Sequence, residues 1–156
     1  MSADLATSVR HGTITVATLL ERKRTVLELE VLTTGLSLEG HISDPDISSP
    51  GLALAGFTAR FAEGRMQVFG ETEMTYLSTL GEAERRERLE TLFRFDIPVV
   101  FVTKGLEVPL EMLEVAAACS VPVVRSSVST KAFYQRIKPY LEAQLAPYTH
   151  LHGSLA

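Results

Sequence analysis

Two short polar segments directly follow apolar runs and carry the side chains best suited to hold a ligand. Thr103-Lys104 follows the first run, and Arg125-Ser126 follows the second. Open parallel sheets bind ligands beyond the carboxyl ends of their strands, so we expect the two segments to meet there. The next helix begins near Ser129, and the unpaired N–H groups of its first turn would attract an anion. These four side chains form a candidate anion site; the alternative is an exposed lysine and arginine beside ordinary helix caps.

Two glycines, Gly51 and Gly56, have the spacing of a phosphate-binding loop. In that motif a lysine, which offsets phosphate charge, follows the second glycine, and a serine or threonine comes next. Here Phe57-Thr58 stand in those places. We therefore interpret the glycines as close-packing sites and expect this segment, taken alone, not to be an enzyme that transfers phosphate.

Metal or thiol chemistry is weakly indicated. His150 and His152 would lie on one side of a strand, a geometry that metals can use, but a third ligand at suitable spacing is absent. Cys119 ends an alanine-rich stretch with no histidine nearby in sequence, which favours buried packing over a catalytic thiol. We expect no metal site.

Two pairs of carboxylates stand two residues apart. Glu71 and Glu73 stand at the start of a helical pattern, and Asp44 and Asp46 flank a proline. Acid–base catalysis uses paired carboxylates, but residues of this type are equally at home in turns and in the first turn of a helix. We favour the structural interpretation for both pairs.

The composition is that of one globular domain. The chain has 156 residues, of which 46% are hydrophobic and 22% charged, and a single cysteine that cannot form an internal disulfide. The net charge of -4 gives no basic surface for nucleic acid. The longest apolar run, 97–102, is far shorter than the roughly 20 residues of a membrane-spanning helix. With no secretory signal pattern at the N-terminus, we expect a soluble, cytoplasmic protein.

The elements that must position these residues alternate between strands and helices. The pattern predicts strands over 26–33, 40–43, 66–69, 99–102 and 121–124, and helices over 15–21, 49–64, 72–80, 82–93, 109–117 and 129–146. The run 99–102 is continuously apolar, as in a strand covered on both faces, and is the expected central strand. We therefore predict an α/β fold, layered, with a mostly parallel sheet flanked by helices.

Several segments resemble the N-terminal domain of HPr kinase/phosphorylase, in both order and spacing, over almost the whole chain. They are SPGLALAGF (49–57), RMQVFG (65–70), EMTYL (73–77), VTKGLEVP (102–109), ST (129–130), YLE (140–142), LAP (145–147) and HG (152–153). The family's N-terminal domain is in turn similar to the uridine-nucleotide-binding domain of muramoyl-peptide ligases. That likeness gives some support to the hypothesis of an anion site, although fold analogy is weak evidence of function.

The resemblance implies a bifunctional bacterial enzyme that uses ATP or pyrophosphate to phosphorylate a serine of HPr, the sugar-transport phosphocarrier, and also removes that phosphate in carbon catabolite regulation. In this family a catalytic domain follows, and its phosphate loop begins shortly beyond the His-Gly pair. We accordingly divide the chain into an HPr kinase-type N-terminal domain, residues 1–146, and a linker with the first residues of the catalytic domain, residues 147–156.

The resemblance also implies cofactors, partners and one site residue. ATP and Mg²⁺ would bind outside this segment, which needs no cofactor itself. His152, of the His-Gly pair, is the family active-site residue that maps onto this chain, and it would be inactive without the downstream domain. The implied partners are the chain's own C-terminal kinase domain, HPr through that domain, and further copies of the chain in a homo-oligomer, a hexamer in this family.

Two functional hypotheses therefore stand. The first is an accessory or regulatory half of a kinase/phosphorylase whose chemistry lies in another domain. The second is a free-standing sensor or binding domain that answers to a small anionic metabolite, such as a nucleotide or sugar phosphate. A phosphate loop encoded beyond residue 156 would support the first.

Overall fold

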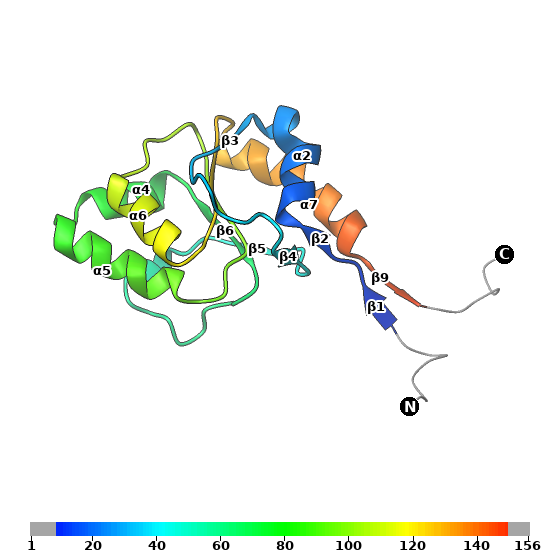
Figure 1. Ribbon diagram of the computed structural model, residues 1–156, viewed down its shortest axis with the longest axis horizontal. Coiled ribbons are helices and arrows are strands. Elements are labelled where there is room, and N and C mark those ends of the chain that lie inside the picture. Colours follow the sequence, from blue (N-terminus) through cyan, green and yellow to red (C-terminus); the bar gives the residue numbers. More distant parts are fainter. Residues whose placement is uncertain (1–8, 150–156) are drawn as a thin grey trace.

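A five-stranded sheet forms the middle layer of the protein. The computed structural model describes residues 9–149 (Figure 1). The strand order across the sheet is β3 (Leu29–Val31), β8 (Val123–Ser126), β7 (Val100–Val102), β6 (Met66–Phe69) and β5 (Ile47–Ser48). The pairs from β5 to β8 are parallel, and β3 joins the edge antiparallel to β8. This confirms the predicted α/β fold with a mostly parallel sheet, and β7 is the central strand as expected.

Helices cover both faces of the sheet. They are α2 (Val16–Leu27), α3 (Gly51–Leu54), α4 (Glu71–Ser78), α5 (Glu82–Phe93), α6 (Leu110–Ala118) and α7 (Thr130–Leu145). One core cluster joins α2 and α7 to one face of the sheet. A second cluster joins the four helices α3, α4, α5 and α6 to the opposite face. Figure 1 shows the same division, with α2 beside α7 and with α4, α5 and α6 grouped apart from them.

The strand residues divide between the two layers because successive side chains of a strand point to opposite faces. Phe101 belongs to the α2–α7 layer, where its ring centroid lies 4.9 Å from that of Phe133. Its neighbours Val100 and Val102 belong to the other layer. All three residues of β7 are fully buried, so the continuous apolar run is explained by a strand covered on both sides.

Two small antiparallel pairs lie outside the main sheet. β2 (Ile14–Thr15) pairs with β4 (His41–Ile42), and β1 (Val9–His11) pairs with β9 (Pro147–Thr149). Figure 1 shows β1 and β9 projecting together from the layered body. The pairing ties residues 147–149, predicted to begin a linker, to the other end of the described chain.

The first helix is longer than predicted, and the strand after it is shorter. Thr15 is the N-cap, and its Oγ1 accepts a hydrogen bond from the Thr18 N–H at 3.1 Å. The helix then continues to Leu27 and ends at Glu28, which has a left-handed φ of 52°. Residues 26–28, predicted to start the strand, therefore belong to the helix and its cap.

The helix predicted over 49–64 is wrong in length. α3 has only four residues, Pro50 stands at its N-cap position, and no side-chain capping bond forms. Ser49 instead places its hydroxyl 3.4 Å from that of Tyr134 on α7. Gly56 has a φ of +109°, which ends the helix and starts an irregular loop that runs to β6.

The last helix agrees with the prediction. Ser129 caps α7 by accepting a hydrogen bond from the Ala132 N–H at 3.1 Å, and Pro139 lies inside the helix. α7 packs its buried residues against α2 and the sheet. Across residues 9–149, none of the helices combines the length and apolar character needed to traverse a bilayer.

Candidate functional site

The ends of β6 and β7 and the start of α7 meet at the carboxyl edge of the sheet. Thr103, directly after β7, is fully buried. Its Oγ1 lies 2.6 Å from the Oγ1 of Thr130 and 3.5 Å from the carbonyl oxygen of Phe69. Since each threonine hydroxyl can both donate and accept, the two satisfy each other at this junction.

Lys104 lies at the rim of this junction with a left-handed φ of 61°. Its Nζ is 3.0 Å from Glu71 Oε1 in the first turn of α4. The two side chains are 41% and 64% exposed, so the pair is a surface salt bridge of little net energy. A shallow hollow of about 410 Å³ lies beside Lys104, lined also by Ser49, Ser129 and the first turn of α4.

The second carboxylate of the Glu71–Glu73 pair caps α4. Glu73 is 8% exposed, and its Oε1 accepts the Gly70 backbone N–H at 2.7 Å. Gly70 must be small here, because a Cβ at this position would lie only 3.0 Å from the Thr130 Oγ1. One glutamate thus forms a surface ion pair and the other a helix cap, in agreement with the structural interpretation.

The two predicted segments are neighbours, but their side chains separate. The Gly105 N–H donates to the Ser126 carbonyl oxygen at 2.9 Å, which places the segment after β7 beside β8. Arg125 and Ser126 lie within β8 rather than beyond it. Arg125 pairs with Glu30 at 2.9 Å, whereas Ser126 is fully buried and donates to the Leu27 carbonyl oxygen at 2.5 Å. The four-residue anion site therefore stays a prediction.

The other candidate residues from the sequence that the structure describes serve in a turn, an ion pair and a helix cap. The Asp46 N–H donates to Asp44 Oδ1 at 2.9 Å, so this carboxylate pair forms a turn. Lys138 lies 2.9 Å from Asp46, and its hydrogen bond and charge hold the pKa of Asp46 below its usual range.

Cys119 is the half-buried C-cap of α6. Within 9–149 no cluster of His, Cys, Asp and Glu could hold a metal, while the predicted His150 and His152 lie outside the described residues.

The Gly51–Gly56 segment has no phosphate-binding geometry. Gly51 begins α3, which is only one turn long, and the left-handed Gly56 ends that turn. Phe57 follows with its side chain 74% exposed, where a phosphate loop would place its lysine.

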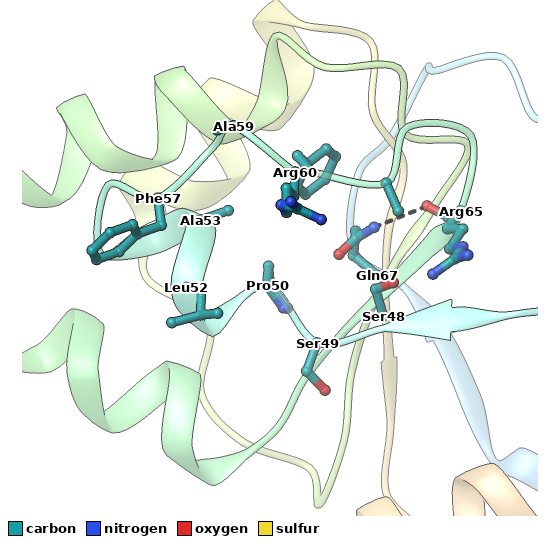
Figure 2. A pocket seen from close by; sticks show the side chains of 12 residues that line it. Ser48, Ser49, Pro50, Leu52, Ala53, Phe57, Ala59, Arg60, Arg65 and Gln67 are labelled. Carbon is teal, nitrogen blue, oxygen red and sulfur yellow. Dashed lines mark hydrogen bonds between the residues drawn. The ribbon is translucent and has the colours of Figure 1, made fainter.

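The sequence did not predict a pocket that lies next to this carboxyl edge. This pocket has a volume of about 570 Å³ and lies between the β5–α3 turn, the 55–65 loop and β6 (Figure 2). It is lined by Ser48, Ser49, Pro50, Leu52, Ala53, Phe57, Ala59, Arg60, Phe61, Ala62, Arg65 and Gln67. The available signal was a polar Gln67 in an otherwise apolar strand, next to a loop rich in small and aromatic residues.

A family model described as the HPr Serine kinase N terminus matches residues 14–141. The chain belongs to this family. Among curated relatives, the HPr kinase/phosphorylase of Exiguobacterium sp. is 38% identical over 82% of this chain and 41% of its own length. That of Halalkalibacterium halodurans is 36% identical over 91% of this chain and 44% of its own length.

The chain thus spans about two-fifths of the length of these HPr kinase/phosphorylase relatives. That arrangement agrees with an N-terminal domain of such an enzyme and does not favour the free-standing alternative. A solved structure of the CBS and DRTGG domains of the regulatory region of Clostridium perfringens pyrophosphatase, complexed with the activator diadenosine tetraphosphate, has a similar fold. Its TM-score is 0.51 at 13% identity, covering 84% of this chain and 53% of that one.

Proposed function

We propose that this chain is the accessory and regulatory N-terminal domain of a bifunctional HPr kinase/phosphorylase, which phosphorylates a serine of HPr and removes that phosphate in carbon catabolite regulation. The observation that carries the proposal is the match itself. Relatives named HPr kinase/phosphorylase align with 82 to 94% of this chain but with only 41 to 44% of their own length. The remaining length of the relatives is available for catalysis.

The division of labour follows from what phosphoryl transfer requires. Mg²⁺ and a loop lysine must offset the charge on the γ-phosphate, and a base must accept the serine proton. Residues 9–149 offer a carboxyl edge whose polar groups bond one another and a glycine pair without its lysine. In this proposal ATP and Mg²⁺ bind in the catalytic domain, where His152 would position an oxygen nucleophile or a phosphate.

The assembly expected for this enzyme is part of the same proposal. The partners of the domain are its own kinase domain and further copies of the chain, in a hexamer, while HPr docks through the kinase domain. The place of action is the cytoplasm. The net charge of -4 supports the exclusion of nucleic acid from this set of partners.

A chimera tests the proposal. The chain replaces the corresponding N-terminal part of the Exiguobacterium enzyme, and HPr phosphorylation is compared among the intact enzyme, the chimera and the enzyme with that part deleted. We expect the chimera to recover the assembly, measured by light scattering, and the rate that the deletion loses. A folded chimera that performs no better than the deletion would contradict the accessory role.

A further inference from the structure

The pocket beside β6 contains a buried hydrogen-bond acceptor without a partner. Gln67 is fully buried, and its Nε2 donates to the Arg65 carbonyl oxygen at 3.1 Å. A carbonyl oxygen only accepts, so the amide nitrogen must face Arg65 and Oε1 must face away. Oε1 has no hydrogen-bond partner among the described residues. Leaving such an oxygen unsatisfied costs about 1–3 kcal/mol, which calls for an explanation.

Figure 2 shows where this oxygen points. The Gln67 carboxamide stands on the inner wall of the pocket, with its oxygen directed away from Arg65 toward the space between Pro50 and Arg60. Since the oxygen accepts only, the group that satisfies it must carry an N–H or O–H. The pocket therefore specifies a donor at its inner wall.

The pocket also has an available positive charge. Arg60 is exposed at the mouth and, among the residues that the structure describes, makes no ion pair or side-chain hydrogen bond. The second arginine, Arg65, is already held by Asp44 at 3.1 Å and by Asp46 at 3.7 Å. Arg60 is thus the guanidinium positioned to receive an anionic group.

Apart from Ser48 and Ser49, the rest of the lining is apolar, with Pro50, Ala53 and Phe61 among its members. Leu52 and Phe57 border the same pocket, and their side chains are 73% and 74% exposed. A volume of about 570 Å³ with mostly apolar walls and a few polar groups is typical of a small-molecule site. An alkyl carboxylate has no N–H or O–H donor and would leave Gln67 Oε1 unsatisfied. A sugar phosphate has little apolar surface and would leave the apolar walls exposed to water.

We propose that this pocket binds a nucleoside monophosphate. The base lies against the apolar wall and donates an amino or ring N–H to Gln67 Oε1, and the phosphate pairs with Arg60. Oε1 is buried, so a ligand reaches it by a shift of the 55–65 loop, which is bordered by the left-handed glycines Gly56 and Gly64. The binding goes beyond the proposed function and requires no phosphoryl transfer, because a monophosphate has no anhydride bond.

Isothermal titration calorimetry of the full chain with AMP, CMP, GMP and UMP tests the proposal. We expect at least one of them to bind. For AMP, the matched analogue is purine riboside 5′-monophosphate, which lacks the amino donor and should bind about tenfold more weakly, the factor for one lost hydrogen bond. Adenosine, which lacks the phosphate, should bind in the same way to the unmodified protein and to Arg60→Ala.

Three variants sharpen the result. Arg60→Ala should weaken monophosphate binding about tenfold, while Arg22→Ala, an exposed arginine on α2, serves as the matched control and should change nothing. Gln67→Leu should bind AMP and its amine-free analogue equally. Because Arg60 is exposed, its replacement does not endanger folding, so the test survives even if the Gln67 variant is unstable.

The outcomes that overturn the proposal are specific. They are an absence of heat for all four monophosphates at millimolar concentration, unchanged affinity of Arg60→Ala for a monophosphate that binds, or, where AMP binds, equal affinity of the unmodified protein for AMP and its amine-free analogue. An unchanged affinity in Lys104→Ala would support the assignment to this pocket rather than to the carboxyl edge. None of these results depends on whether the chain takes part in phosphorylating HPr.

Discussion

Two polar regions lie side by side at this end of the sheet, and Ser49 lines both of them. At the carboxyl edge, the hydroxyls of Thr103 and Thr130 are hydrogen-bonded, Glu73 accepts the Gly70 N–H, and the exposed Lys104 pairs with a glutamate. In the neighbouring pocket, by contrast, Gln67 Oε1 has no partner. The first region uses its polar groups to hold three elements together, whereas the second contains a buried acceptor without a partner among the described residues. Polarity by itself therefore does not identify a binding site; the absence of a partner is the better indicator.

The largest effect is expected at the carboxyl edge. Glu73→Ala removes the acceptor of the Gly70 N–H, so we expect the free energy of unfolding to fall by about 2 kcal/mol. Urea denaturation measures it, and Glu71→Ala is the control, with a change below about 0.5 kcal/mol because its pair is exposed. Equal effects of the two variants would mean that the region is not held together by its buried bonds.

The pocket should respond differently. Gln67→Leu removes both the unsatisfied oxygen and the bond to the Arg65 carbonyl oxygen, and the two effects oppose each other. We expect the free energy of unfolding to change by less than about 1 kcal/mol in the same urea assay. A loss as large as that of Glu73→Ala would show that Gln67 serves stability, which would remove the contrast between the regions.

A smaller effect is expected for the predicted anion site. Lys104→Ala breaks one exposed pair and should lower the free energy of unfolding by less than about 0.5 kcal/mol. Arg125→Ala breaks the pair with Glu30 and a long hydrogen bond to the Leu106 carbonyl oxygen, and should lower it by less than about 1 kcal/mol. Calorimetric titration with sugar phosphates tests whether these cations bind anions at all. An absence of heat even for the unmodified domain would contradict the prediction of an anion site.

The smallest effect concerns a carboxylate near the pocket. The hydrogen bond and charge of Lys138 lower the pKa of Asp46, so Lys138→Met should raise that pKa toward the ordinary value of 3.8, as measured by NMR titration. A lowered pKa means that the pair stabilises the fold above the ordinary value and that this contribution is lost as the pH falls through the lowered one. An unchanged pKa in the variant would contradict the assignment to Lys138.

The sequence predicted the elements that have strong patterns and clear boundaries. β6 and α5 have the predicted bounds, 66–69 and 82–93, because glycine or charged residues border them and apolar residues recur at the right period. The first helix was predicted too short because its apolar residues are followed by the charged run 21–24, which forms the exposed continuation of the same helix. The 49–64 helix failed because Gly56 adopts a left-handed φ that periodicity does not reveal.

For the candidate anion site, the sequence predicted which backbone segments are neighbours but not where their side chains lie. The sequence placed the segment after β7 beside residues 125–127, and the hydrogen bond from the Gly105 N–H to Ser126 confirms that neighbourhood. It could not show that Lys104 and Arg125 would find separate carboxylates, because those partners come from distant elements. Nor could it show that Gln67 lacks a partner, because that depends on the path of the 55–65 loop.

The central claim is that phosphoryl transfer is not performed by this chain itself. The direct test is to incubate the purified chain with radiolabelled ATP, Mg²⁺ and HPr, and to measure label on the HPr serine beside the intact Exiguobacterium enzyme as a positive control. We predict no transfer above the rate without protein, because no lysine stands in the glycine loop to offset the charge of the migrating phosphate. Label appearing at an enzymatic rate would contradict the account.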